Sequence, residues 1–143
     1  MKTLLNIAIV LLTLPSIYGQ SDMEAINATL TDYIEGSTNG QPERLKKAFH
    51  PDLNLYTTRN NELSIYPGVK YIEGTKKGEP TGEKGTVISI DYENHVAVAK
   101  VEISHPENPN TYVDYFLLLK IEDHWTIVQK AYTRRASNKI TKK

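Results

Sequence analysis

The sequence predicts an α+β fold in which N-terminal helices pack on a curved antiparallel sheet. Near the start, apolar side chains recur every three or four positions, the period of an amphipathic helix, whereas from Thr86 onward they alternate with the period of two that is typical of strands. Four strand-like segments then follow with short turns, as in a meander. Because the helices precede the strands, we expect them to cover one face of the sheet and to leave a tapered cavity against it.

The first residues have the features of a cleavable signal peptide. Lys2 gives a basic start, residues 4–14 are almost unbroken apolar sequence, and Gly19 precedes a polar segment. The apolar run is shorter than the roughly 20 residues that a transmembrane helix needs. We therefore predict a signal peptide at 1–19, a secreted or periplasmic protein, and no membrane span after cleavage; a retained anchor is the alternative.

Composition excludes several functional classes. The chain of 143 residues has no cysteine, so it has no disulfide, thiolate metal site or lipid-modified cysteine. Its 17 basic and 17 acidic residues balance, which disfavours a nucleic-acid partner. Basic residues gather at the end of the chain. We predict a single domain at 20–134 and a flexible basic tail at 135–143, with contact to an anionic surface as the alternative.

Three helices are predicted before the meander. The first begins at Ser21, which forms a capping box with Glu24, and ends at a turn after residue 38. The second begins at Pro42 and ends before Pro51. A hairpin over 53–66 precedes a short third helix over 69–77. The side chains expected to face inward from these helices are Met23, Ile26, Leu30, Tyr33, Ile34, Leu45, Ala48, Phe49, Val69 and Ile72.

The meander is predicted to contain strands over 86–92, 96–104, 111–121 and 125–133. In the first of these, Ile88, Ile90 and Tyr92 are expected on one side of the sheet. In the third, the apolar run over 116–119 indicates burial on both faces.

Several segments carry a family resemblance. Ala48-Phe49-His50-Pro51-Asp52, the strand over 114–121 and the hairpin that ends on Trp125 resemble the nuclear transport factor 2-like superfamily, and more narrowly its exported bacterial branch labelled lumazine-binding. The resemblance covers about residues 22–134. It implies a cone-shaped fold with a central pocket and, often, a homodimer through the outer face of the sheet. Where the family usually has glycine before the tryptophan, Asp123-His124 stand here, and aspartate tolerates left-handed geometry.

The resemblance names no activity, because the same fold includes isomerases, cyclases, dehydratases and binding domains. The catalytic candidates are Asp114, His50 and Tyr33. Asp114 would be a general base if it faces the cavity and a solvated carboxylate if it lies at the rim. His50 would move protons near neutral pH or cap the second helix. Tyr33 would donate a hydrogen bond to a carbonyl or pack in the core.

A wider set of residues is expected to line the pocket. Gln129 and Lys130 lie on opposite faces of the last strand, so only one faces inward, and glutamine costs less to bury. Tyr115 and Tyr132 are further candidates for the cavity wall. The predicted pocket residues are Tyr33, Phe49, His50, Tyr56, Asp114, Phe116, Trp125 and Gln129.

No metal or cofactor site is predicted. His50, His95, His105 and His124 are scattered without a paired spacing such as HExxH, and the glycine-rich stretch over 78–85 lacks the phosphate-binding pattern GxxxxGK[ST].

Three functions are therefore open. The leading hypothesis is a non-catalytic domain that encloses a small apolar or aromatic ligand. The first alternative is an isomerase, cyclase or dehydratase that uses Asp114 as base and Tyr33 or His50 as acid. The second is a structural dimerisation module in which Leu117, Leu119 and Ile121 are buried against a partner sheet.

Overall fold

The computed structural model describes residues 21–136 and confirms the α+β fold. The predicted signal peptide and residues 137–143 of the predicted tail lie outside the described residues. The elements are α1 (Asp22–Thr38), α2 (Pro42–Ala48), β1 (Phe49–Arg59), β2 (Glu62–Pro67), α3 (Gly68–Glu73), β3 (Lys84–Glu93), β4 (Val96–Ser104), β5 (Asn110–Ile121) and β6 (His124–Ala136). None of the described helices is long and apolar enough to cross a membrane.

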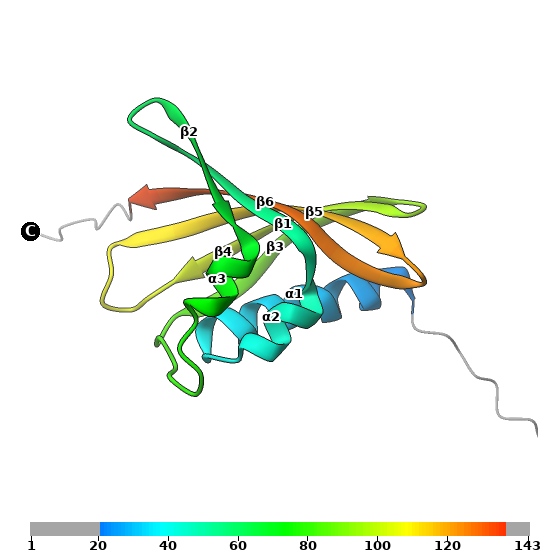
Figure 1. Cartoon of the computed structure of the whole chain (residues 1–143), viewed down its shortest axis with the longest axis horizontal. Helices are drawn as coiled ribbons and strands as arrows, with labels where there is room; N and C mark the ends of the chain where they lie inside the picture. The colour runs from blue at the N-terminus through cyan, green and yellow to red at the C-terminus, as the bar shows by residue number, and fades with distance from the viewer. Residues whose placement is uncertain (1–20, 137–143) are drawn as a thin grey trace, which may run out of the picture.

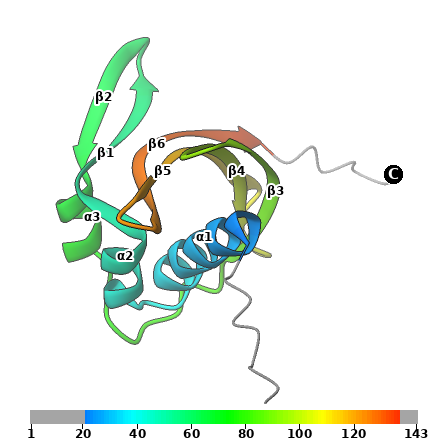
Figure 2. The ribbon, with the colours of Figure 1, turned by 90° about the vertical axis from the view of Figure 1, so that its right-hand side faces the viewer.

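All six strands belong to one sheet with the order β2-β1-β6-β5-β4-β3. The sheet is mixed, because β1 pairs with β6 in parallel while every other pairing is antiparallel. β3 to β6 arch over α1, and the β1–β2 hairpin projects away from the body (Figures 1 and 2). The sheet thus forms one wall of a cone, and the helices form the other.

Helix α1 fills the concave side of the sheet. The predicted capping box is present, with the Ser21 hydroxyl accepting from the Glu24 amide and the Glu24 carboxylate accepting from the Ser21 amide. Ile26, Leu30 and Tyr33 are fully buried, as predicted. The prediction for Met23 was wrong, because this residue lies in the first turn of α1 and is exposed.

Bulges give the sheet its curvature and shift the alternation of side chains. One extra residue in β3 interrupts its pairing with β4 between Val87 and Ser89. That residue is Ile88, which is exposed, whereas Val87 and Ile90 pack against the core. The prediction that Ile88 and Ile90 lie on the same side of the sheet was therefore wrong. A bulge bends a strand and increases its twist, which is how the sheet curls around α1.

Helix α3 is shorter than predicted, and it is rotated about its axis so that a different face packs against the core. It ends at Glu73, and Val69 is exposed while Tyr71 and Ile72 pack against the core. The predicted inward position of Val69 was wrong because Gly68 is the residue that meets the sheet. A Cβ atom there would lie 2.6 Å from Leu53 Cδ2, so the helix approaches β1 at this point. Tyr71 and Ile72, three and four positions after Gly68, lie on the same face of the helix and therefore also face the core.

The β5–β6 hairpin and the start of α1 close the narrow end of the cone. Glu122 and Asp123 both have positive φ, 48° and 65°, which fits a two-residue type I′ turn and confirms that aspartate accepts left-handed geometry. Trp125 Nε1 donates to Asp22 Oδ1 at 2.9 Å, and Lys120 Nζ lies 2.9 Å from the same oxygen. Both contacts lower the pKa of Asp22, and the contact with Lys120 has the larger effect.

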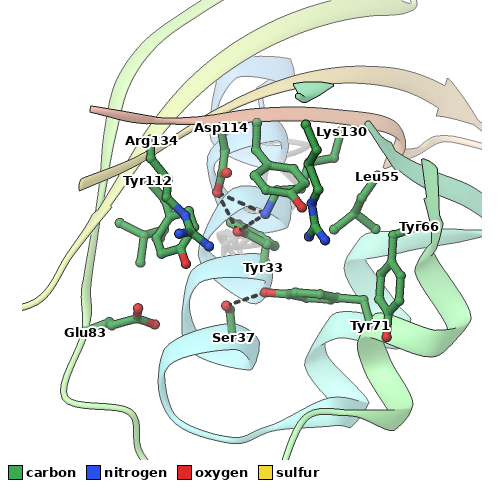
Figure 3. Close-up of a pocket in the computed structure, with 13 residues that line it drawn as sticks. Tyr33, Ser37, Leu55, Tyr66, Tyr71, Glu83, Tyr112, Asp114, Lys130 and Arg134 are labelled. Atoms are coloured by element: carbon green, nitrogen blue, oxygen red, sulfur yellow. Dashed lines mark hydrogen bonds and ion pairs between the residues drawn. The ribbon is translucent and has the colours of Figure 1, made fainter. Parts of the chain in front are cut away.

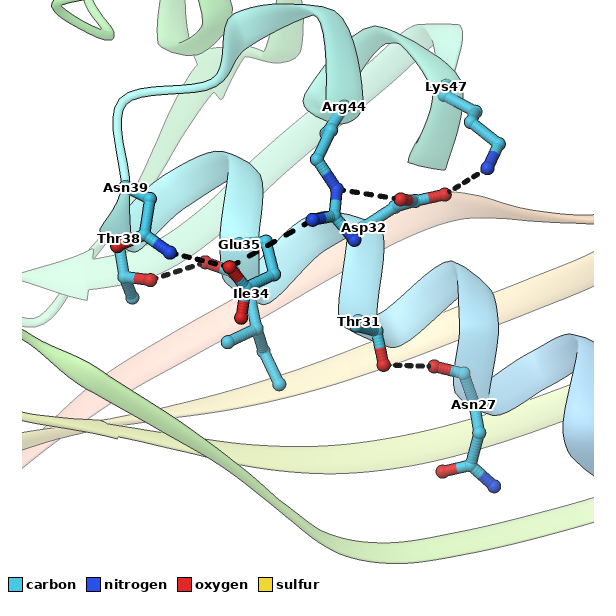
Figure 4. A network of polar contacts seen from close by, with 9 residues as sticks. All are labelled: Asn27, Thr31, Asp32, Ile34, Glu35, Thr38, Asn39, Arg44 and Lys47. Atoms are coloured by element: carbon cyan, nitrogen blue, oxygen red, sulfur yellow. Dashed lines mark hydrogen bonds and ion pairs between the residues drawn. The ribbon is translucent and has the colours of Figure 1, made fainter. Parts of the chain in front are cut away.

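An ion-pair network joins α1 to α2 (Figure 4). Asp32 Oδ1 accepts from Arg44 Nε at 2.8 Å, and its Oδ2 lies 2.7 Å from Lys47 Nζ. Burial alone would raise the pKa of Asp32, but the two cations together outweigh burial and lower it. The folded state therefore favours the ionised form of this carboxyl.

We predict that Asp32→Asn weakens the dependence of stability on acid pH. A carboxyl with a lowered pKa in the folded state stabilises the fold above its unfolded pKa and loses that contribution as pH falls through the folded value. At pH 7 the variant should be less stable by about 1 kcal/mol. Urea denaturation at pH 7 and pH 3 should show this difference shrinking at the lower pH. The control is Asp52→Asn, whose side chain is almost fully exposed; an equal effect in both variants would contradict the assignment.

Candidate functional site

The wide end of the cone contains a pocket of about 390 Å³ between α1, α3 and the inner face of the sheet. Five tyrosines line it: Tyr33 from α1, Tyr66 at the end of β2, Tyr71 from α3, Tyr112 from β5 and Tyr132 from β6. Figure 3 shows Tyr66 and Tyr71 on one side and Tyr112 on the other. Leu55 and Ile103 add aliphatic surface. These walls suit a flat organic molecule, since aromatic rings stack on one another.

Three polar side chains meet at the floor of the pocket. Tyr33 Oη donates to Asp114 Oδ2 at 2.6 Å, and Lys130 Nζ donates to Tyr33 Oη at 2.6 Å. Lys130 Nζ also lies 3.1 Å from Asp114 Oδ2. The three atoms form a closed triangle, visible in Figure 3 as three dashed lines.

The triangle is withdrawn from bulk water. Asp114 is 1% exposed and Lys130 is 5% exposed. The Lys130 ammonium lies over the rings of Tyr33, Tyr71 and Tyr132 at 4.7, 5.3 and 5.6 Å from their centroids. Ring faces attract cations, which offsets part of the cost of burying the charge.

Tyr33 keeps its proton in this environment. Burial, with Tyr71 and Asp114 beside it, raises the pKa of the Tyr33 phenol well above its usual value. The hydroxyl therefore remains a donor to Asp114 and an acceptor from Lys130 over the physiological range. Such a phenol is a weak acid, and its evident task is to hold the other two groups in place.

Two groups of the triangle have hydrogen-bonding capacity that the described residues do not use. Asp114 Oδ1 is buried and has no hydrogen-bond partner among the residues that the structure describes. Lys130 contacts two oxygens, so one of its three N–H donors remains. A base and a donor thus lie side by side at one end of an aromatic pocket, an arrangement that suits proton transfer next to a carbonyl group.

The structure places two of the three catalytic candidates together. Tyr33 and Asp114 contact each other, and the alternative of a solvated Asp114 at the rim is wrong because β5 points this side chain into the cone. His50 lies elsewhere: its Nδ1 accepts from the Asp52 amide at 3.2 Å, and its side chain is 38% exposed. His50 is not among the residues that line the pocket.

In β6 the side chain of Lys130 faces inward and that of Gln129 faces outward, the reverse of the prediction. The β5–β6 register shifts so that Leu117 pairs with Gln129 while Leu118 pairs with Ile127, which leaves Val128 as an extra residue. Before this bulge Trp125 and Ile127 face inward, and after it Lys130 does so while Gln129 is exposed. The inward prediction for Gln129 was wrong for this reason.

The other residues predicted to line the pocket pack in the core or lie elsewhere on the sheet. Phe49 and Phe116 are buried and pack against Tyr33, with centroids 5.7 and 4.8 Å from its ring. Trp125 lies at the narrow end of the cone beside Asp22. Tyr56 lies on the outer face, where its hydroxyl accepts from Gln129, and Tyr115 is exposed on that face as well. Tyr132 lines the pocket, as predicted.

Sequence reasoning missed Lys130, Arg59, Arg134 and three of the tyrosines. Tyr66 lies in β2 just before α3, and Tyr71 lies in α3. The rotation of this helix depends on the close contact at Gly68. Arg134 lies just beyond the strand predicted over 125–133, but β6 continues to Ala136 and Arg134 lines the pocket. For Tyr112, strand parity with Asp114 was an available signal.

A cone of N-terminal helices and one curved sheet is the nuclear transport factor 2-like fold. Residues 21–133 match the model of the family described as "Putative lumazine-binding", and the chain belongs to that family. A curated relative is "Aldolase FrzH" from Cladobotryum sp., which is 28% identical over 115 residues, covering 78% of this chain and 90% of the relative.

Solved structures share the fold. An NTF2-like protein of unknown function from Shewanella baltica OS155 superposes with a TM-score of 0.69 at 24% identity, covering 83% of this chain and 100% of that chain. One from Methylobacillus flagellatus KT superposes with a TM-score of 0.68 at 28% identity, covering 80% of this chain and 93% of that chain.

We predict that Lys130→Met is strongly destabilising and that a second change restores part of the loss. Removing the cation leaves the Asp114 carboxylate buried and unpaired, which costs about 3–5 kcal/mol. Replacing Asp114 by Asn in the Lys130→Met background removes that charge, so the double variant should be more stable than the single one. Urea denaturation of the four proteins measures the coupling.

The matched control for this cycle is the surface pair Arg135–Glu102, whose atoms are 2.9 Å apart. Arg135→Gln should cost less than about 1 kcal/mol. A Lys130→Met protein as stable as wild type, with no coupling to Asp114, would show that the triangle is not a buried charge pair in solution.

Proposed function

We propose that this protein is an enzyme that transfers a proton next to the carbonyl group of a small organic compound, in an aldol-type or related reaction. The observation that carries the proposal is the unpartnered Asp114 Oδ1 beside the Lys130 ammonium, both at the floor of the tyrosine-lined pocket. A general base and a hydrogen-bond donor that converge on one reacting group are the minimum that such chemistry requires.

The reaction follows from the positions of these groups. Asp114 Oδ1 takes a proton from the carbon next to the carbonyl. The electron pair of that C–H bond forms a carbon–carbon double bond, and the π electron pair of the carbonyl moves to its oxygen, which gives an enolate. The free N–H of Lys130 donates to that oxygen and stabilises its negative charge. In an aldol step the enolate carbon bonds to a second carbonyl carbon, whose oxygen takes the proton from Asp114. Retro-aldol cleavage is the reverse.

Two further observations support this proposal. The relative from Cladobotryum sp. has the printed name "Aldolase FrzH", and its similarity to this chain extends over most of both proteins. The low exposure of Asp114 and Lys130 excludes water, which strengthens the field of the ammonium on a developing oxyanion.

A second candidate function is binding without chemistry, the leading hypothesis from the sequence. It is favoured by the contacts of Asp114 and Lys130 with each other and with Tyr33, which also suit a purely structural network. The five tyrosines would then hold a flat aromatic ligand, in keeping with the family's description.

We predict that the wild-type protein accelerates exchange of the protons next to the carbonyl in enolisable ketones. The probes are phenylacetone, which is neutral, and levulinate, which is anionic, followed in D₂O by ¹H NMR. Asp114→Asn should lower the protein-catalysed rate about 100-fold, since general bases contribute 10²–10⁴-fold.

Asp52→Asn, which changes an exposed aspartate outside the pocket, is the control and should retain full activity. Near-UV circular dichroism checks that each variant is folded. Benzoylformate, which has no proton next to its ketone, should inhibit wild-type exchange by occupying the pocket. Exchange at the buffer rate with the wild-type protein and both ketones would refute the catalytic proposal and leave the binding role.

We also propose that the protein is exported and forms a homodimer through the outer face of the sheet. Export is supported by the composition of residues 1–19. For the dimer, the support is an apolar outer surface on β3, β4 and β5 that includes exposed Ile88, Val96, Val98, Tyr115 and Ile121. Isolated apolar residues are normal on a surface, but a contiguous patch indicates an interaction site.

We predict that Tyr115→Glu converts the dimer to a monomer. The new carboxylate would have to be desolvated in the interface, and the neighbouring Lys100 ammonium would offset only part of that cost. Light scattering coupled to size exclusion should give a dimer mass for wild type and a monomer mass for the variant. Leu63→Glu, at an exposed position on the β1–β2 hairpin, should remain dimeric. A monomeric wild-type protein at micromolar concentration would exclude the dimer.

A further inference from the structure

The tyrosine-lined pocket continues into a groove where β1 and β6 separate. Their parallel pairing ends at Tyr56 and Ala131. Beyond this point a groove of about 590 Å³ lies between the strand ends, and Arg59, Tyr132 and Arg134 line both it and the tyrosine pocket. The Thr57 hydroxyl donates to the Tyr132 carbonyl at 2.8 Å and fixes the two strands where the groove begins. One elongated molecule can therefore contact both spaces.

The two arginines of this groove are not neutralised by acids within residues 21–136. Arg44 pairs with Asp32 and Arg135 pairs with Glu102, whereas no ion pair is formed by Arg59 or Arg134 in that part of the chain. The groove lining contains threonine, asparagine and tyrosine besides the arginines, and no carboxylate among the residues described. Glu83 lies at the edge of the tyrosine pocket, where it accepts from Thr81 Oγ1 at 3.1 Å.

The Arg134 guanidinium is also held in place. Its central carbon lies 5.0 Å from the centroid of the Tyr112 ring, and Figure 3 shows it beside that ring at the edge of the pocket. Stacking on an aromatic face leaves the N–H donors of a guanidinium free at its edge, in the planar fork that matches a carboxylate. The charged side chains that line the tyrosine pocket are three cations (Arg59, Lys130, Arg134) and two anions (Glu83, Asp114), which leaves one positive charge for a ligand to balance.

We propose that the substrates are carboxylate-bearing carbonyl compounds. The carbonyl end and any flat ring lie among the tyrosines with the carbonyl toward Lys130, and the carboxylate lies between Arg59 and Arg134. This inference rests on the proposed function of the pocket. It adds a second group, a carboxylate, to the substrate whose carbonyl would react there. A monoanion matches the single uncompensated positive charge.

The test compares benzoylformate with its neutral methyl ester by isothermal titration calorimetry. Neither compound has a proton next to its ketone, so binding is measured without turnover. Wild type should bind the acid at least about 10-fold more tightly than the ester, since charge-assisted hydrogen bonds are the strong ones. Arg59→Gln and Arg134→Gln should each remove most of this preference while ester binding persists, and 0.5 M NaCl should reduce it.

Arg135→Gln is the matched control, because Arg135 is the next residue on β6, faces the other side and pairs with Glu102. It should retain the wild-type preference. Equal affinity for acid and ester, or an unchanged preference in Arg59→Gln and Arg134→Gln, would overturn the carboxylate site and leave the proposed function in place. Absence of binding by both compounds would overturn the carboxylate site and the ligand pocket together.

Discussion

The buried pair of Lys130 and Asp114 is the constraint around which the rest of this structure is arranged. Two opposite charges inside a small domain are tolerated only if each compensates the other, because a lone buried charge costs about 3–5 kcal/mol and a typical domain has only about 5–15 kcal/mol of stability in total. Tyr33 bridges the pair from α1, and four aromatic rings surround the ammonium. Helix, sheet and pocket therefore meet at one polar cluster.

Sheet curvature brings these groups together. Asp114 and Lys130 lie on neighbouring strands, and Lys130 faces inward because of the extra residue at Val128 in β6. The same bulge bends the strand, so it contributes to the concave surface and also brings the charge to its floor. The inward position of Lys130 in the candidate site thus depends on one irregularity of the sheet.

Periodicity predicted most of the fold, including the capped first helix, the meander and the cavity. It failed where local geometry breaks the period. Ile88 and Gln129 were assigned to the wrong face because each lies at or just after a bulge, and no turn residue marks either bulge in the sequence. Val69 was misplaced because the packing of α3 is set by the absence of a side chain at Gly68. Asp114 and Tyr33 were predicted, whereas Lys130 was rejected on its burial cost, which its pairing with Asp114 offsets.

The central claim is that the unused acceptor of Asp114 and the unused donor of Lys130 face a bound carbonyl compound. A crystal structure with benzoylformate tests this most directly. The account predicts the ketone oxygen within about 3 Å of Lys130 Nζ, at hydrogen-bond distance, with the adjoining ring carbon facing Asp114 Oδ1. A ligand bound elsewhere, or a pocket filled only by water with Asp114 Oδ1 turned to a protein donor, would contradict it.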